Sequence, residues 1–275
     1  MIRFATPPPD AASAGREDRR KVDLVAISDV HLGTRACRAA DLLVYLQAIA
    51  PRRLLLVGDI IDGWMFSASG WPEQHTAILQ ELGAMLAAGT QIIYITGNHD
   101  DMLRRYSPME AGNLLLCDEY ELELGGKRTW FCHGDLLEHS VPTPRWMSRL
   151  GGLAFDGLAM ADVPLNATRR RLGLGPTASV AWFKSRLPGV ARHIRAYEDA
   201  CAQAAAARGC AAVVTGHIHL PNLREVDVGE QRVTYLNCGD WVENCSALEW
   251  HDGDWSLVQA AGVGDVVEQR DMALA

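Results

Sequence analysis

Residues 28–33 read Ser-Asp-Val-His-Leu-Gly and directly follow the largely apolar run of residues 22–27, Val-Asp-Leu-Val-Ala-Ile. Such a run predicts a buried β-strand, because short apolar segments rich in branched side chains fit the inside of a sheet. Asp29 and His31 then stand two residues apart, just past the strand end. A carboxylate and an imidazole in that position are a natural pair of metal ligands.

Four later segments repeat this arrangement of an apolar strand followed by Asp, Asn or His. Asp59 follows a strand expected at 53–57, Asn98 one at 91–96, His133 one at 128–132, and His217 and His219 one at 211–215. In open α/β sheets, ligands bind outside the carboxyl ends of the strands. We therefore expect seven side chains to converge at one edge: Asp29, His31, Asp59, Asn98, His133, His217 and His219.

These seven donors comprise four imidazoles, two carboxylates and one amide, with no thiolate. The set suits divalent Mn, Fe or Zn and is too rich in nitrogen for Mg or Ca alone. Seven ligands are too many for one tetrahedral ion, but they fit two ions held ~3.5–4 Å apart by a shared carboxylate. Asp59, on a central strand, is the natural bridge. We expect two divalent ions, Mn, Fe or Zn, that activate water against phosphorus.

The third of these segments adds candidate catalytic groups. Asn98 would orient a phosphate oxygen besides binding metal, and His99 would protonate the leaving oxygen, with the Asp100 carboxylate fixing the tautomer of His99. The alternative is that His99 only supports the ligands. Asp62 is expected to be a loop residue or a supporting partner. The histidines outside the pattern are expected at the surface or in packing; they are His75, His139, His193 and His251.

Composition limits the class of protein. The 275 residues, 48% of them hydrophobic and 22% charged, fit one large globular domain or a domain with an insertion. The net charge of −8 argues against a specific nucleic-acid partner. Seven scattered cysteines without a Cys-x-x-Cys pair predict reduced thiols. No apolar run approaches the ~20 residues that span a bilayer. We expect a cytoplasmic protein, and its oligomeric state stays open.

Strands that alternate with helices early and hairpins late predict a mixed sheet or two stacked sheets flanked by helices. Helices are expected at 39–50, where Pro51 ends the first, at 73–88 and at 191–207. The strands at 223–228, 232–237 and 247–250 are expected to form an antiparallel meander. The expected organisation is a disordered tail (1–20), a core (21–135 and 196–260), an insertion (136–195) and a flexible tail (261–275).

The insertion is basic and helix-rich, with a local net charge of +6 in an acidic chain. One interpretation is a structural cap, whose apolar side chains only pack on the core. The other, which we favour, is a lid that accepts acyl chains while its bases meet a diphosphate or the anionic inner-membrane surface. The candidate substrate contacts are Arg35, Asn98, Trp146, Arg149, Lys184 and Arg192.

Together the segments contain the motifs D-x-H, G-D-x-x-D, G-N-H-D, H-G-D and G-H-x-H over residues 22–250. This signature resembles that of the calcineurin-like metallophosphoesterase family. The resemblance implies a four-layer α/β/β/α sandwich with a Mn-type dimetal centre. It also implies the ligand sets: Asp29, His31, Asp59 and His219 for one ion, and Asp59, Asn98, His133 and His217 for the other.

Within that superfamily the chain is most similar to the UDP-2,3-diacylglucosamine pyrophosphatases of lipid A synthesis, which also carry a helical insertion before G-H-x-H. The resemblance implies hydrolysis of UDP-2,3-diacylglucosamine to UMP and an acylated sugar phosphate of the lipid X type, at the periphery of the inner membrane. One departure is His99, where the best-characterised pyrophosphatases carry Arg. The alternatives are a phosphodiesterase or phosphatase of a soluble nucleotide or another phospholipid and, more remotely, a non-catalytic scaffold that has lost its metals.

Overall fold

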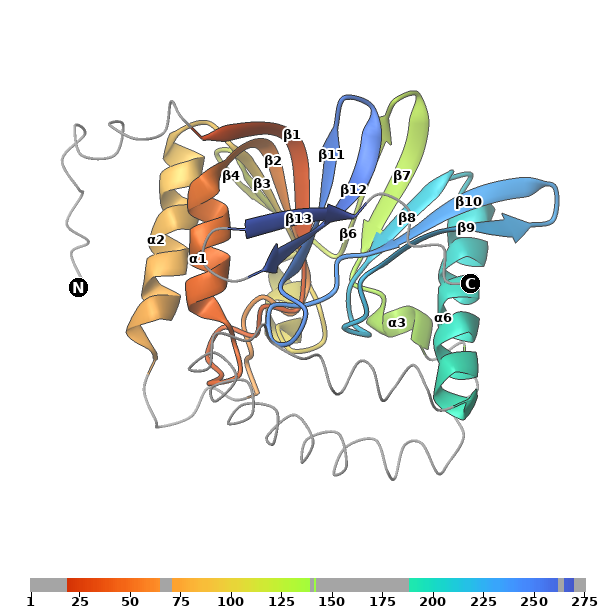
Figure 1. The fold of residues 1–275 in the computed structure, drawn as a ribbon, viewed down its shortest axis with the longest axis horizontal. Helices are drawn as coiled ribbons and strands as arrows, with labels where there is room; N and C mark the ends of the chain where they lie inside the picture. The colour runs from red at the N-terminus through yellow and green to blue at the C-terminus, as the bar shows by residue number, and fades with distance from the viewer. Residues whose placement is uncertain (1–18, 65–70, 139–140, 142–187, 262–264, 270–275) are drawn as a thin grey trace.

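The computed structural model describes residues 19–64, 71–138, 141, 188–261 and 265–269. Two β-sheets lie face to face, with helices on the outside of each (Figure 1). Among the described residues the first sheet has this strand order: β13 (Asp265–Gln269), β12 (Asp254–Ala261), β11 (Ser246–His251), β1 (Arg20–Ile27), β2 (Ile49–Val57), β3 (Gln91–Ile95), β5 (Leu114–Cys117) and β4 (Met109–Ala111). Its central strands β1, β2, β3 and β5 run parallel, so their carboxyl ends share one edge.

The second sheet is shorter. Its described strands follow the order β6 (Glu119–Leu124), β7 (Lys127–Cys132), β8 (Ala212–Thr215), β10 (Gln231–Asn237) and β9 (Asn222–Val228). Strands β7, β8 and β10 are parallel, while β6 and β9 are antiparallel edges. Helices α1 (Ala39–Ala48) and α2 (Glu73–Ala87) cover the first sheet, and α6 (Pro188–Ala207) covers the second (Figure 1). The four-layer α/β/β/α architecture is confirmed.

Side-chain alternation along the strands explains the layers. In β1, Val25 and Ile27 face α1 and α2, whereas Leu24 and Ala26 face the second sheet. In β8, Val213 packs toward α6. Central strands such as β1 therefore contribute to two apolar layers and are hydrophobic on both faces, as a sheet covered on both sides requires. All seven cysteines are unpaired thiols, as expected.

Several expected boundaries were wrong. Helix α1 ends at Ala48, and Ile49, Ala50 and Pro51 already belong to β2, where Pro51 pairs with Val22. Strands β9 and β10 pair antiparallel as expected, but β11 joins the other sheet beside β1, so the three do not form one meander. Strand β13 lies inside the segment expected to be a flexible tail.

Helix α6 starts at Pro188, within the segment assigned to the insertion. Short helix α3 (Asp135–Glu138) lies just before that segment, and residues 139–140 and 142–187 lie outside the described residues. Residues 1–18 also lie outside them. In the described part of the chain, no helix combines the length and apolarity that crossing a bilayer requires.

Candidate metal centre

The loops after β1, β2, β3, β7 and β8 meet at one edge of the sandwich, as the strand-end pattern predicted. Beyond the strands the first two loops still run side by side, because the backbone N–H of His31 donates to the Asp59 carbonyl at 3.0 Å. Five of the candidate ligands have a left-handed backbone, with φ between 52° and 69°: Asp29, His31, Asp59, His217 and His219. That conformation is uncommon outside glycine and clusters at functional sites, where the surrounding structure must enforce it.

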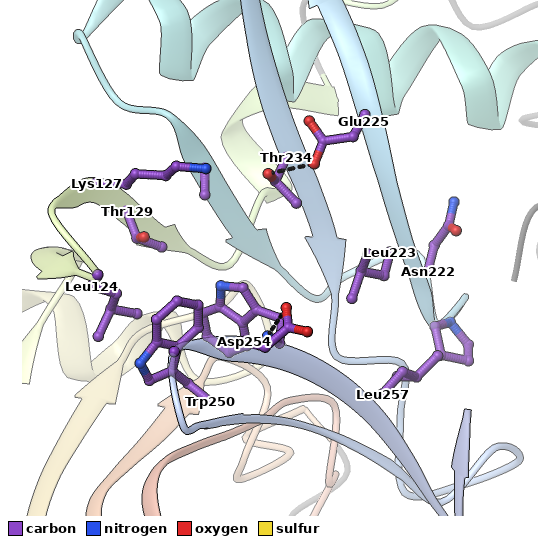
Figure 2. Close-up of a pocket in the computed structure, with 15 residues that line it drawn as sticks. Leu124, Lys127, Thr129, Asn222, Leu223, Glu225, Thr234, Trp250, Asp254 and Leu257 are labelled. Carbon is purple, nitrogen blue, oxygen red and sulfur yellow. Dashed lines mark hydrogen bonds between the residues drawn. The ribbon is translucent and has the colours of Figure 1, made fainter. Parts of the chain in front are cut away.

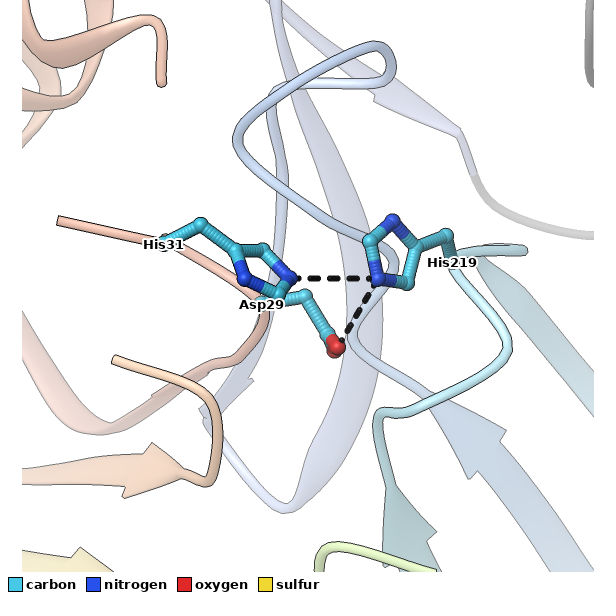
Figure 3. Close-up of side chains that lie close together, drawn as sticks. All are labelled: Asp29, His31 and His219. Atoms are coloured by element: carbon cyan, nitrogen blue, oxygen red, sulfur yellow. Dashed lines mark hydrogen bonds and ion pairs between the residues drawn. The ribbon is translucent and has the colours of Figure 1, made fainter. Parts of the chain in front are cut away.

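The first cluster of donors joins the ends of β1 and β8. His31 Nε2 and His219 Nε2 lie 3.3 Å apart, and His219 Nε2 lies 3.1 Å from Asp29 Oδ1 (Figure 3). Asp29 is fully buried, and its Oδ1 atom, which makes no well-aligned hydrogen bond among the described residues, has His219 Nε2 at ion-pair distance. A buried carboxylate oxygen that faces two imidazole nitrogens fits a metal ion placed between them, because a divalent cation compensates its loss of water more fully than one imidazole does.

The second cluster joins β2, β3 and β7. His133 Nε2 lies 3.2 Å from Asp59 Oδ2 and 3.2 Å from the Asn98 side-chain oxygen. Asp59 and His133 are buried. Donor atoms of Asp29, Asp59 and His133 lie within 4.8 Å of one another, as do those of Asp29, His31 and His219. Asp29 therefore belongs to both of these clusters. Asp59, the carboxylate that we expected to bridge the two ions, belongs to the second of them.

Two of the imidazoles have a defined tautomer. Nδ1 of His31 lies 3.2 Å from Asp62 Oδ2, and Nδ1 of His133 lies 2.9 Å from the Val57 carbonyl oxygen. Both partners are acceptors, so the proton of each neutral ring is on Nδ1 and the lone pair is on Nε2, which faces the cluster. Metal-binding histidines commonly hold their second nitrogen in this way. Asp62 thus has the supporting position that the sequence suggested.

The ionisation of the clustered groups shows how strongly they favour positive charge. Burial alone would lower the pKa of His133, but its hydrogen bond to Asp59 and the charges of Asp29 and Asp59 outweigh burial and raise the pKa to about 10. Burial would raise the pKa of Asp29, yet His219 and its neighbours hold it below its ordinary value. The Asp29 and Asp59 carboxylates therefore stabilise positive charge beside them. A divalent metal ion bound there would neutralise more of their charge than the single proton on His133 does.

This ionisation predicts how the stability of the metal-free protein depends on pH. The folded-state pKa of His133 is raised from 6.5 to about 10, so its contribution is complete below pH 6.5 and declines as the pH rises toward 10. We expect the unfolding temperature in excess chelator to fall between pH 6.5 and 8.5, below the range where buried thiols titrate. His133→Asn should flatten that slope, and an unchanged slope in the variant would contradict the assignment.

His99 lies at the rim of the site, and its partner differs from the one expected. Nδ1 of His99 is 3.0 Å from Asp62 Oδ2 and Nε2 is 3.9 Å from Asp59 Oδ2. Asp100 was the expected partner, but its carboxylate accepts hydrogen bonds from Tyr94 Oη and from the backbone N–H groups of Gly97 and Ile60. Asp100 therefore joins two loops, and Asp62 orients His99.

His217 is the candidate ligand that stands apart from both clusters. Its backbone N–H donates to Asp29 Oδ2 at 3.0 Å, and its ring centre lies 5.3 Å from that of His133. Its Nε2 is 2.7 Å from Oε2 of Glu138, in α3. Glu138 was missed in the sequence, where its only signal is its position a few residues after H-G-D.

The candidate substrate contacts are only partly described. Arg35 follows β1 and Arg192 lies on α6, and both side chains are exposed. Trp146, Arg149 and Lys184 lie outside the described residues. Trp64, 64% exposed, stacks on His99 with ring centres 4.0 Å apart.

The histidines outside the pattern are in packing or surface positions where they are described. His75 is buried and accepts a hydrogen bond from the Gly33 N–H, so it supports the first loop. His251 is half-exposed beside Asp23. His193 lies near Glu138, and His139 lies outside the described residues.

A separate cavity of about 350 Å³ opens between the two sheets (Figure 2). Trp250 and Trp255 lie on one side of it, and Thr234 and Glu225, joined by a hydrogen bond, lie on the other. None of the metal-cluster residues lines it. Its size suits a small ligand, but the candidate metal ligands lie outside it.

Comparison of the sequence with known proteins identifies a family for this chain. The sequence profile described as "Calcineurin-like phosphoesterase" matches residues 23–221. A UDP-2,3-diacylglucosamine hydrolase of Aeromonas salmonicida is 28% identical over 239 residues, covering 85% of this chain and 91% of the relative. One of Stenotrophomonas maltophilia is 26% identical, covering 84% and 96%. Among solved structures, a Vps29 double mutant from Entamoeba histolytica aligns over 90% of this chain with 13% identity and a TM-score of 0.44.

Proposed function

We propose that this chain, which belongs to the calcineurin-like phosphoesterase family, is a dinuclear-metal hydrolase that cleaves the phosphoric anhydride of a UDP-linked acylated glucosamine. Family membership makes it a metal-dependent hydrolase of phosphorus compounds. The observation that supports a metal centre in this chain is the convergence of buried oxygen and nitrogen donors at the strand ends, with Asp29 common to two clusters.

The proposed ligands divide into two sets. Asp29, His31, Asp59 and His219 would hold one ion, and Asp59, Asn98, His133 and His217 the other. When bound, two such ions lower the pKa of a shared water and neutralise charge on the phosphate oxygens. Mn is the proposed metal, with Fe and Zn as alternatives that satisfy the same donors.

His99 is proposed as the group that protonates the leaving oxygen. Asp62 orients the ring through Nδ1, so Nε2 faces the cluster, 3.9 Å from Asp59. A protonated Nε2 in that position delivers its proton to an oxygen bound beside the metals. Asn98 would bind metal and phosphate together, while Asp100 supports the loops on which both residues stand.

Replacing His99 by alanine tests that role. We expect kcat to fall by about 10²–10⁴-fold with a poor leaving group, such as the alkoxide of an alkyl phosphodiester. With nitrophenolate as leaving group the loss should be much smaller, because that oxygen needs no proton. The measurement is kcat for both substrates at full metal occupancy, and equal losses would show that His99 does not act as the acid.

The substrate class rests on the relatives and on charge. The two relatives described above are named for UDP-2,3-diacylglucosamine and are covered over most of their length. The basic, apolar segment 136–195 offers groups of the kind that an acylated diphosphate requires. Arg35, Arg149, Lys184 and Arg192 are proposed to contact phosphate, and Trp146 an acyl chain. We place the protein in the cytoplasm, at the inner-membrane surface where such a substrate lies.

Hydrolysis of the proposed substrate is the direct test. Purified protein with Mn and UDP-2,3-diacylglucosamine in detergent should release UMP and the acylated sugar phosphate. Intact substrate after prolonged incubation would overturn the substrate assignment. The alternative, a soluble nucleotide as substrate, is favoured by His99 in place of Arg. It predicts comparable turnover of an unacylated UDP-sugar without detergent.

A further inference from the structure

Glu138 contacts the candidate metal centre from outside the five motifs. Its Oε2 atom lies 2.7 Å from Nε2 of His217. An ionised carboxylate only accepts hydrogen bonds, so the proton of neutral His217 is on Nε2 and its lone pair is on Nδ1. The Nδ1 atom is therefore the one that can bind a metal.

We propose that Glu138 is a positioning residue for His217, holding its ring so that Nδ1 is presented to the second metal ion. This inference rests on the proposed function, which makes His217 a ligand of that ion. Two of the other ligand histidines follow the same principle, because Asp62 accepts from one nitrogen of His31 and the Val57 carbonyl accepts from one nitrogen of His133. For His217 the acceptor comes from α3.

Helix α6 supports the same contact from the opposite side. His193, on α6, has Nε2 3.9 Å from Oε1 of Glu138, so the carboxylate lies between two imidazoles. Tyr197 of α6 lies 6.2 Å, between ring centres, from His217. Gly134, with φ +104°, passes so close to the Tyr197 hydroxyl that a β-carbon would overlap it. Helix α6 thus packs against the turn that leads into α3, and Glu138, 42% exposed, lies between His217 and His193.

A merely structural role is the competing explanation, because Glu138 also ties α3 to the loop after β8. The two explanations differ in what a metal titration shows. Loss of a positioning residue weakens the affinity of one ion, typically by about 10- to 100-fold. Loss of a structural tie lowers the unfolding temperature and affects both ions together, or neither.

The experiment titrates the metal-free full chain with Mn²⁺ by calorimetry. Wild type should bind two ions. Glu138→Ala should weaken one of them by about 10- to 100-fold and leave the other within about threefold. Glu138→Gln should largely restore it, because an amide oxygen still accepts the Nε2 hydrogen. The control is Glu121→Ala, which removes a carboxylate with 36% exposure, near the 42% of Glu138, from a surface pair with Arg128.

Two outcomes overturn the inference while the proposed function stands. In one, Glu138→Ala binds both ions as wild type does; in the other, it weakens both ions equally and Glu138→Gln gives no rescue. Wild type that binds fewer than two ions overturns the proposed function, and this inference with it. Thermal unfolding of each metal-free variant, measured alongside, separates loss of fold from loss of affinity.

Discussion

Replacing Asp59 with alanine is expected to lower kcat for any phosphodiester by roughly three orders of magnitude or more, because the proposed reaction needs both ions. Asp59 is buried at the end of the central strand β2. Its Oδ1 accepts the His99 N–H at 2.8 Å, and its Oδ2 lies 3.2 Å from His133 Nε2. The measurement is steady-state hydrolysis of a nitrophenyl phosphodiester with saturating Mn.

Asp59→Asn is the matched variant, because it keeps the volume and one oxygen but removes the charge that two ions would share. It should lose activity nearly as completely while it retains the fold by circular dichroism. Asp227→Ala, at an exposed position paired with Arg232, should retain full activity. Substantial hydrolysis by Asp59→Ala would show that Asp59 is not an essential part of the metal centre.

Replacing Gly97 with alanine is the second change expected to have a large effect. A β-carbon at Gly97 would overlap the Asp59 carboxylate and lie 2.5 Å from the Asp59 backbone nitrogen. The loops after β2 and β3 would have to separate, which displaces Asp59 and Asn98 together. We expect a loss of more than about tenfold in metal affinity, as for loss of groups that support ligands, and a matching fall in kcat.

Gly83→Ala is the control for that change, since it makes the same substitution on an exposed turn of α2. Beyond the adjoining residues and the backbone of α2 itself, a β-carbon there has no described atom within 4 Å, so alanine should stabilise the protein by roughly 0.5–1 kcal/mol through helix propensity. Activity should not change. Wild-type metal affinity in Gly97→Ala would show that the two loops tolerate separation and that the close approach has no role.

The architecture was accessible from the sequence because β1, β2, β3, β7 and β8 are buried on both faces and end in polar residues. Burial makes such strands continuous apolar runs, and parallel strands bring their ends to one edge. The pairing of β11 was not accessible. The pattern of apolar and polar side chains in β11 is compatible with pairing either to β10 or to β1. Contacts between residues distant in sequence decide which strand it pairs with.

The partner of each side chain in the site could not be predicted from the sequence either. His99 is followed directly by Asp100, yet it is oriented by Asp62, 37 residues earlier in the chain. The reason is loop geometry: Asp100 turns inward to bind the N–H groups of Ile60 and Gly97, and Asp62 faces the rim. Glu138 was missed for a similar reason, because α3 and α6 place it and no motif contains it.

An anomalous-scattering map of crystals grown with Mn²⁺ tests the central claim most directly. The account predicts two peaks per chain, about 3.5–4 Å apart. One should be bound by Asp29, His31, Asp59 and His219, and the other by Asp59, Asn98, His133 and His217. A single peak, or two peaks held by other residues, would contradict a dinuclear centre at this sheet edge.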